Sequence, residues 1–145
     1  MKRAIDIMTP DPACCAPETL LGAVAKLMVQ HKCGEIPVVD ADGQLIGVVT
    51  DRDIVCRVLA AGKNPLDHTV QDCMSQPALS VHPETPLPDV IATMERHQIR
   101  RVPVVDDQER CIGIVAQADL AWAGQQKEVA VLVREVSRES DRPSR

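Results

Sequence analysis

Apolar and polar residues follow two patterns along this chain, and both patterns occur twice. After each of two Pro-Glu-Thr triplets, apolar residues recur three or four positions apart, and short continuous apolar runs come next. The helically spaced residues are Leu20, Val24, Leu27 and Met28, then Leu87, Val90, Ile91 and Met94. The apolar runs are Ile36–Val39 and Leu45–Val49, then Val102–Val105 and Cys111–Val115. The patterns predict a helix followed by two strands, present in duplicate.

The duplication is an internal repeat of the sequence itself. A shift of 66 residues places Met8–Ile54 on Met74–Leu120 without a gap, and 16 of the 47 aligned positions are identical. The identical pieces include Pro17–Thr19 with Pro83–Thr85, Pro37–Asp40 with Pro103–Asp106, Ile46–Gly47 with Ile112–Gly113, and Asp53 with Asp119. A gapless match of this length predicts two structurally equivalent units.

Turn and cap signals complete the prediction for each repeat. Each triplet is expected to start a helix, with Thr19 or Thr85 as the N-cap. Asp40–Gly43 is a hairpin turn, because glycine supplies the positive φ that such turns need, and Asp106–Arg110 takes its place in the second repeat. Extended pieces and further helices are expected at Ala13–Ala16 and Asp51–Ala61, then at Leu79–His82 and Gln117–Ala123. Each repeat is therefore a β-α-β-β-α unit.

The repeats also predict the domain organisation. We expect a first repeat over residues 1–61, a linker over 62–68, a second repeat over 69–124, and a C-terminal helix and tail over 125–145. Within the tail, Val129–Val136 has the spacing of a packing helix. One unit buries too little surface to be stable alone, so we predict an α+β fold in which two pseudo-symmetric units pack sheet to sheet in one disc.

Composition excludes several classes of protein. The single aromatic residue is Trp122, and the formal net charge is −5, so base stacking and phosphate-backbone binding are both disfavoured and no nucleic-acid partner is expected. No apolar run approaches the roughly 18 residues of a membrane helix, and Asp6 interrupts the N-terminus before a signal peptide could form. We therefore expect a cytoplasmic protein with no membrane association.

Cysteines are frequent for this length. The six are Cys14, Cys15, Cys33, Cys56, Cys73 and Cys111. They form no Cys-x-x-Cys motif, and without an export signal we expect free thiols that fill small core positions. The adjacent Cys14 and Cys15 fit a strand that points one thiol to each face. His31 and His97 occupy equivalent positions near helix ends, but the spacing gives no metal-ligand motif and no metal site is predicted.

The repeated motifs resemble the CBS (cystathionine-β-synthase) domain, present here as a tandem pair. The resemblance rests on Asp-Ile-Met-Thr, Pro-Glu-Thr-Leu, Ile-Pro-Val-Val-Asp and Gly-Val-Val-Thr-Asp-Arg-Asp, and it extends from about Ile5 to Trp122. The stretch from Thr50 to Gly62 is similar to stand-alone bacterial CBS-pair proteins, including the group called hypoxic response proteins. The resemblance implies two clefts that bind adenosine ligands: AMP, ADP or ATP, and in some members S-adenosylmethionine or NAD.

The family motif Gly-h-x-Thr/Ser-x-x-Asp, with h apolar, implies which residues bind the ligand. The first repeat has the full motif, in which Thr50 lies at the ribose–phosphate end and Asp53 accepts the ribose hydroxyls. By resemblance, Arg100 and Arg101 of the opposite repeat contact the phosphate. The walls around adenine are expected to be Val81, His82 and Val102. An ordinary solvated charge cluster also explains the arginine pair.

The second cleft is expected to be weaker. Its motif keeps Asp119 but has Ala116 in place of the hydroxyl residue, and its other members are Glu35 and Ala16. Two like charges about 5 Å apart repel by roughly 1–3 kcal/mol, so Glu35 would oppose a phosphate. The prediction is an asymmetric pair in which this cleft is empty or takes a ligand without phosphate. Asp119 also fits a helix-turn residue with no ligand.

These observations predict a non-enzymatic regulatory module that binds an adenine nucleotide at Asp53 and signals to a partner protein. No nucleophile–base pair, Gly-rich phosphate loop or metal motif is found, and no cofactor is required. CBS pairs usually associate, so the resemblance implies a homodimer acting on an unidentified effector protein. Two alternatives remain open: a ligand-free scaffold with decayed clefts, and a thiol- or metal-responsive switch that uses the six cysteines.

Overall fold

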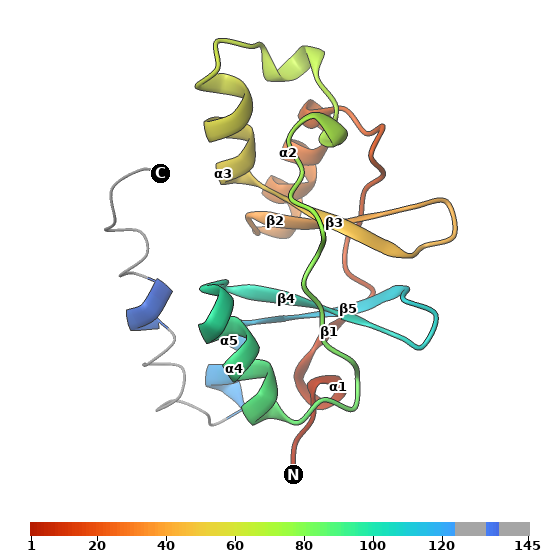
Figure 1. Cartoon of the computed structure of the whole chain (residues 1–145), viewed down its shortest axis with the longest axis vertical. Coiled ribbons are helices and arrows are strands. Elements are labelled where there is room, and N and C mark those ends of the chain that lie inside the picture. Colours follow the sequence, from red (N-terminus) through yellow and green to blue (C-terminus); the bar gives the residue numbers. More distant parts are fainter. Residues whose placement is uncertain (124–132, 137–145) are drawn as a thin grey trace. The chain divides into compact units, whose positions relative to one another are not determined.

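The computed structural model describes residues 1–123 and 133–136, and its contacts divide the chain into two compact units. The first-repeat unit consists of Asp11–Leu79 with Asp107–Cys111. The second-repeat unit consists of Met1–Pro10, Ser80–Asp106 and the described residues from Ile112 onward. Each unit has its own hydrophobic core, and the helices and strands of both units are labelled in Figure 1.

The first-repeat unit combines one long helix with a β-hairpin. Its elements are α2 (Leu21–His31), β2 (Glu35–Val39), β3 (Leu45–Thr50), α3 (Asp51–Asp53), the π-helix η1 (Ile54–Leu59), and the 3-10 helices η2 (Pro65–Asp67) and η3 (Val70–Asp72). Strands β2 and β3 are antiparallel, with Glu35 opposite Thr50. Cys15 adds a parallel bridge to Val38. The buried core is aliphatic, with Leu21, Val24, Met28, Ile36, Val38, Val49, Val58 and Val70 beside two thiols, Cys15 and Cys73.

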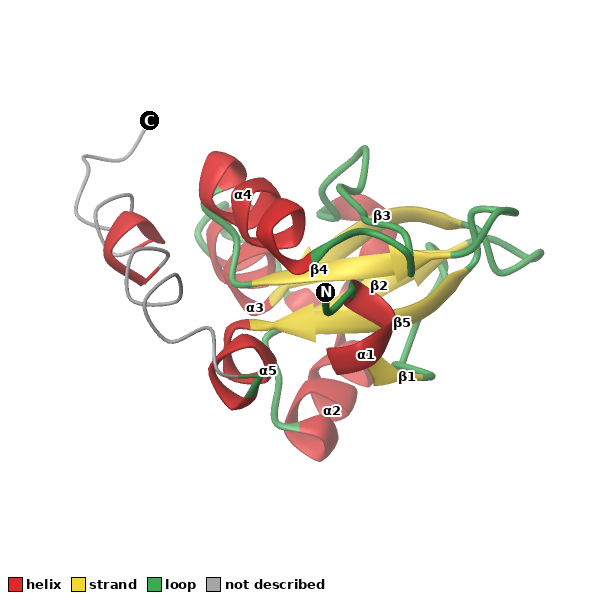
Figure 2. Cartoon of the chain, turned by 90° about the horizontal axis from the view of Figure 1, so that it is seen from below, coloured by secondary structure: helices red, strands yellow, loops and turns green. Residues whose placement is uncertain are grey.

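The second-repeat unit likewise contains a long helix, two antiparallel strands and a short helix in succession. Its elements are α1 (Ala4–Ile7), β1 (Thr9–Pro10), α4 (Leu87–His97), β4 (Arg101–Val105), β5 (Cys111–Ala116) and α5 (Gln117–Trp122). The sheet order is β1-β5-β4 (Figure 2). Val81 adds a parallel bridge to Val104. All four helically spaced residues predicted for α4 are buried in the core, which explains why this helix forms on the sheet.

The two units exchange short extended segments. Thr9 of β1 pairs with Ile114 of β5, and Ser75 pairs with Val48 of β3, which are equivalent positions in the two repeats. Each segment covers the edge of a sheet that would otherwise have unpaired backbone groups. By their contacts, residues 1–10 therefore belong to the second-repeat unit and residues 69–79 to the first-repeat unit.

The predicted threonine caps are wrong. The Thr19 hydroxyl accepts a hydrogen bond from the Ala16 N–H, and the Thr85 hydroxyl accepts one from the His82 N–H, both at 3.0 Å. Each threonine thus closes the turn before its helix. The N-cap of α2 is Leu20, whose position leaves its side chain 54% exposed, so its place in the predicted buried stripe is also corrected.

The helix predicted over Asp51–Ala61 is present but changes its winding. After one turn of α3, the Ala60 N–H donates to the Val55 carbonyl at 2.8 Å, five residues back, and the chain continues as η1. The predicted linker 62–68 contains η2. In the tail, Val133–Val136 are helical, and the rest of the predicted helix over Val129–Val136 lies outside the described residues. Among the residues that are described, no helix combines the length and apolar character needed to cross a membrane.

Candidate functional site

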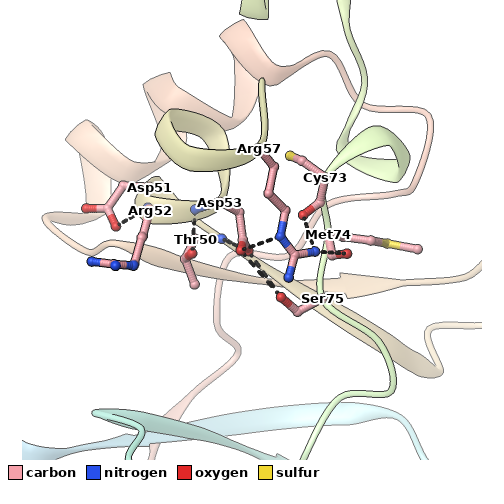
Figure 3. A network of polar contacts seen from close by, with 8 residues as sticks. All are labelled: Thr50, Asp51, Arg52, Asp53, Arg57, Cys73, Met74 and Ser75. Carbon is pink, nitrogen blue, oxygen red and sulfur yellow. Dashed lines mark hydrogen bonds and ion pairs between the residues drawn. The ribbon is translucent and has the colours of Figure 1, made fainter. Parts of the chain in front are cut away.

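Thr50 and Asp53 form a closed turn at the end of β3. The Thr50 hydroxyl accepts a hydrogen bond from the Asp53 N–H, and the Asp53 carboxylate accepts one from the Thr50 N–H, both at 3.0 Å (Figure 3). This reciprocal capping box requires a short hydroxyl residue and a carboxylate three positions apart. The arrangement fixes the Asp53 side chain before any ligand is present.

The Asp53 carboxylate is buried and has further polar neighbours. Asp53 is 9% exposed. The Ser75 hydroxyl lies 3.4 Å and 3.5 Å from the two carboxylate oxygens, and the Arg57 Nε lies 3.7 Å from Oδ1. The Arg57 guanidinium also donates to the carbonyls of Cys73 and Met74, at 3.3 Å and 3.4 Å. The carboxylate is thus charge-compensated by a cation that the backbone holds in place.

Arg57 and Ser75 are site residues that the sequence analysis missed. Arg57 could have been found, because a residue four positions after an acid lies beside it on a helix. Ser75 could not be found from local spacing, because it lies 22 residues away and reaches the site through the exchanged segment. The site therefore depends on the pairing of that segment with β3.

Gly47, the first residue of the motif, is required by this pairing. A Cβ at position 47 would lie 2.7 Å from the Ser75 carbonyl oxygen, a backbone atom. The equivalent Gly113 faces the exchanged segment of the second-repeat unit. A Cβ at position 113 would lie 3.2 Å from the Thr9 carbonyl oxygen and would also collide with Met8. In both units the glycine allows the exchanged segment to approach the sheet closely.

The second repeat forms only half of this turn. The Ala116 N–H donates to the Asp119 carboxylate at 2.8 Å, but Ala116 has no side-chain oxygen to accept a bond in return. Asp119 is only partly buried, whereas Asp53 is buried. The two repeats therefore hold their carboxylates differently, because only the first has a hydroxyl at this position.

The residues predicted to contact the phosphate and the adenine all belong to the second-repeat unit. In the second-repeat unit, Arg100 is exposed, and its carbonyl accepts a hydrogen bond from the Gln117 N–H at 3.1 Å, while Arg101 begins β4 and is partly exposed. Val81 and Val102 belong to the core of the same unit, so their side chains pack against other apolar residues, and His82 is exposed.

Glu35 and Ala16 belong to the first-repeat unit. Glu35 begins β2 directly opposite Thr50, and the Ala16 N–H is bound to Thr19. The structure thus places Thr50, Asp53 and Glu35 near one another in one unit, and the arginine pair at the start of β4 in the other. Over residues 1–123 and 133–136, no group of three or more His, Cys, Asp or Glu side chains is arranged to hold a metal ion.

The family model for the CBS domain matches residues 4–60 and 70–125. The chain therefore belongs to the CBS domain family and contains a tandem pair, which confirms the predicted family. The α+β class predicted for its fold is confirmed as well.

Two bacterial CBS-domain proteins are similar to this chain over most of its length. Over 121 residues, the chain is 37% identical to hypoxic response protein 1 of Mycobacterium tuberculosis, with 83% of this chain and 84% of the relative covered. It is 42% identical to the CBS domain-containing protein YhcV of Bacillus subtilis, with the same coverage.

Solved structures with a similar fold contain different ligands. The crystal structure of hypoxic response protein I, with two coordinated zinc ions, has a TM-score of 0.76 at 37% identity and covers 83% of this chain and 97% of that one. The CBS domain pair of protein MJ0100, in complex with 5′-methylthioadenosine and S-adenosyl-L-methionine, has a TM-score of 0.77 at 29% identity, with 88% and 98% covered. CBSX2 in complex with AMP has a TM-score of 0.76 at 28% identity, with 88% and 99% covered.

Proposed function

We propose that this chain is a regulatory module that binds one adenine nucleotide through Asp53. The observation that carries the proposal is the closed Thr50–Asp53 turn, which holds a buried carboxylate in a fixed orientation. A carboxylate has about four acceptor positions, and the backbone N–H of Thr50 occupies one of them. The remaining positions suit the two adjacent hydroxyls of a ribose. Binding would then displace the long contacts from Arg57 and Ser75 rather than the capping bond.

The phosphate of this nucleotide is assigned to Arg100 and Arg101. Two guanidinium groups at the start of β4 offer paired N–H donors that match phosphate oxygens. For the turn at Asp119, the family resemblance assigns Glu35 to the position of these arginines, and Ala116 removes the hydroxyl. The proposal is therefore one phosphate-bearing ligand per chain. The second cleft is empty or takes a ligand without phosphate.

Similar structures support an adenosine ligand. The CBS pair of MJ0100 holds S-adenosyl-L-methionine and 5′-methylthioadenosine, and CBSX2 holds AMP. All three molecules share the adenosine group whose ribose Asp53 is proposed to bind. Among them, AMP fits the arginine pair best, because it is the one with a phosphate.

The output of the module is proposed to be a change in its association with a partner protein. A ligand shifts a conformational equilibrium only if it binds one conformation more tightly than the other. Nucleotide binding must therefore favour one conformation of the protein, and with it one arrangement of the surface that contacts the partner. The described surface of the first-repeat unit exposes apolar side chains suited to such contacts, including Val29, Val55, Leu59 and Leu66. We propose a homodimer that acts on an effector protein without catalysing a reaction itself.

Isothermal titration tests the proposal with AMP, with adenosine, and with Arg101→Ala. We expect one AMP per chain, and an affinity for adenosine lower by about 10- to 150-fold, the loss that corresponds to one charge-assisted hydrogen bond of roughly 1.5–3 kcal/mol. Arg101→Ala should weaken AMP binding, by less than the removal of the phosphate does because Arg100 remains, and should leave adenosine binding unchanged. Arg96→Ala, an exposed arginine at the end of α4, is the matched control and should bind as the wild type does.

The contrary result is equally clear. If the folded protein shows no heat with AMP, ADP, ATP, S-adenosylmethionine or NAD, the nucleotide proposal fails. The alternative of a ligand-free scaffold then stands, and the search for a partner protein becomes the informative experiment.

A further inference from the structure

Three of the six cysteines lie close together in the first-repeat unit. Cys15 is held beside β2, since its N–H donates to the Pro37 carbonyl at 3.0 Å and its carbonyl accepts from the Val39 N–H at 2.9 Å. Cys15 points into the core, so the preceding Cys14 points to the opposite face of the strand. On that face the thiol of Cys111 donates a hydrogen bond to the Cys14 sulfur. The Cys14 and Cys111 thiols, 97 positions apart in the sequence, are therefore hydrogen-bonded to each other.

Backbone bonds hold the second member of this pair in place. The Cys111 N–H donates to the Gly43 carbonyl at 3.3 Å, and the Glu109 carbonyl accepts from the Leu45 N–H at 2.9 Å. The segment 107–111 is thereby fixed to the hairpin turn of the first-repeat unit, although β5 continues into the other unit. Both cysteines therefore lie on backbone segments that are hydrogen-bonded to the first-repeat unit, so no loop rearrangement is needed to bring them together.

Cys14 and Cys111 differ from Cys15 and Cys73 in solvent exposure, and Cys14 differs from both buried cysteines in the direction of its pKa shift. Cys14 and Cys111 are partly exposed, whereas Cys15 and Cys73 are buried. The hydrogen bond from Cys111 lowers the pKa of the Cys14 thiol, and this effect exceeds the opposing effect of burial. Burial, together with the neighbouring Cys14, raises the pKa of Cys15 to about 12. Burial also raises the pKa of Cys73. Of these three, Cys14 is therefore the thiol most available as a thiolate.

We propose that Cys14 and Cys111 are a redox modification site, which a peroxide converts into an intramolecular disulfide. The Cys14 thiolate attacks one oxygen of the peroxide, the O–O bond breaks, and Cys14 becomes a sulfenic acid as hydroxide leaves. The Cys111 thiolate then attacks the Cys14 sulfur, the S–S bond forms, and a second hydroxide leaves. The two released thiol protons combine with the two hydroxides as water. Two electrons pass from the sulfur atoms to the peroxide, and a dithiol reductant reverses the change.

The position of the pair gives the bond a consequence for the whole chain. Cys14 lies four residues after the point where the chain enters the first-repeat unit, and Cys111 is the last residue before it leaves that unit. The bond would close a ring from residue 14 to residue 111, which restricts the unfolded chain. Oxidised protein should therefore unfold at a higher urea concentration than reduced protein, by a shift that Cys14→Ser and Cys111→Ser abolish.

Peptide mapping after treatment with hydrogen peroxide tests the assignment. The tryptic peptide 4–26 contains Cys14 and Cys15, and the tryptic peptide 111–127 contains Cys111 alone. We expect these two peptides to be joined in the non-reduced digest, with the loss of two free thiols per chain and a mass lower by two hydrogen atoms. Cys15→Ala should keep the bond, which distinguishes the two adjacent thiols. In Cys111→Ser, a dimedone adduct should mark Cys14 as the oxidised residue.

Cys56→Ser is the matched control, because Cys56 is exposed and belongs to no described cluster. This variant should form the bond at the wild-type rate. The proposal is overturned if peptides 4–26 and 111–127 remain separate at a peroxide concentration that oxidises Cys56, or if the crosslink survives in Cys14→Ser. Neither outcome depends on nucleotide binding, so the failure of one proposal leaves the other intact.

Discussion

Asp53→Asn is expected to weaken AMP binding by about 30- to 150-fold. The asparagine keeps the size of the side chain and one oxygen that can accept from the Thr50 N–H, so the turn should persist. It loses the charge, and its amide group presents hydrogen-bond donors to ribose hydroxyls that must also donate. Losing the charge assistance of two hydrogen bonds corresponds to roughly 2–3 kcal/mol, which sets the expected range.

Asp119→Asn is the control for this result, because it makes the same chemical change in the equivalent turn. Its affinity for AMP should stay within about twofold of the wild type, since the phosphate-bearing ligand is assigned to the other repeat. Titration calorimetry supplies both affinities, and urea unfolding shows whether each variant is folded. Equal losses in the two variants would contradict the asymmetry, and an unchanged Asp53→Asn would remove the assigned site.

Gly47→Ala is expected to lower the free energy of unfolding by about 2–4 kcal/mol. The new Cβ would lie 2.7 Å from the Ser75 carbonyl oxygen, and a backbone atom cannot rotate away as a side chain can. The exchanged segment would have to move off β3. This movement weakens the two bonds between Val48 and Ser75, which are now 3.1 Å and 2.8 Å. Overpacking of roughly 1–3 kcal/mol and about 0.5 kcal/mol for each of the two weakened bonds give the estimate.

Gly22→Ala provides the comparison, because the same methyl group is added in the first turn of α2. There the Cβ would lie 3.2 Å from the end of the Leu66 side chain, which can shift, and alanine favours the helix. Its free energy of unfolding should change by no more than about 1 kcal/mol. Urea denaturation with a common m-value measures both variants. If Gly47→Ala is as stable as Gly22→Ala, the close approach at Gly47 is not required.

The sequence predicted those features that depend on residues near one another in the chain. Strands β2, β3, β4 and β5 and both long helices follow from apolar spacing, and the structure contains all of them. The lack of a hydroxyl at Ala116 is visible in the sequence, but the capping turns at Thr50–Asp53 and Ala116–Asp119 were not predicted. Because the sequence is repeated, the same pattern predicted the helix and the two strands in both units.

The features that the sequence did not predict depend on contacts between distant residues or on a choice among local hydrogen bonds. Ser75 reaches Asp53 only because an extended segment pairs with β3. Thr19 had two partners available, an N–H in the helix after it and the Ala16 N–H before it, and spacing alone does not choose between them. The contact of Cys14 with Cys111 likewise follows from the path of the backbone through both units.

The exchange of extended segments has a consequence for how this chain can be divided, in the laboratory or in evolution. A cut in the region 62–68 would give two fragments, each holding an edge strand that belongs to the sheet of the other. Neither fragment would be a complete folding unit, although each would contain one full repeat. Neither half can therefore be deleted without exposing the β-sheet edge of the half that remains.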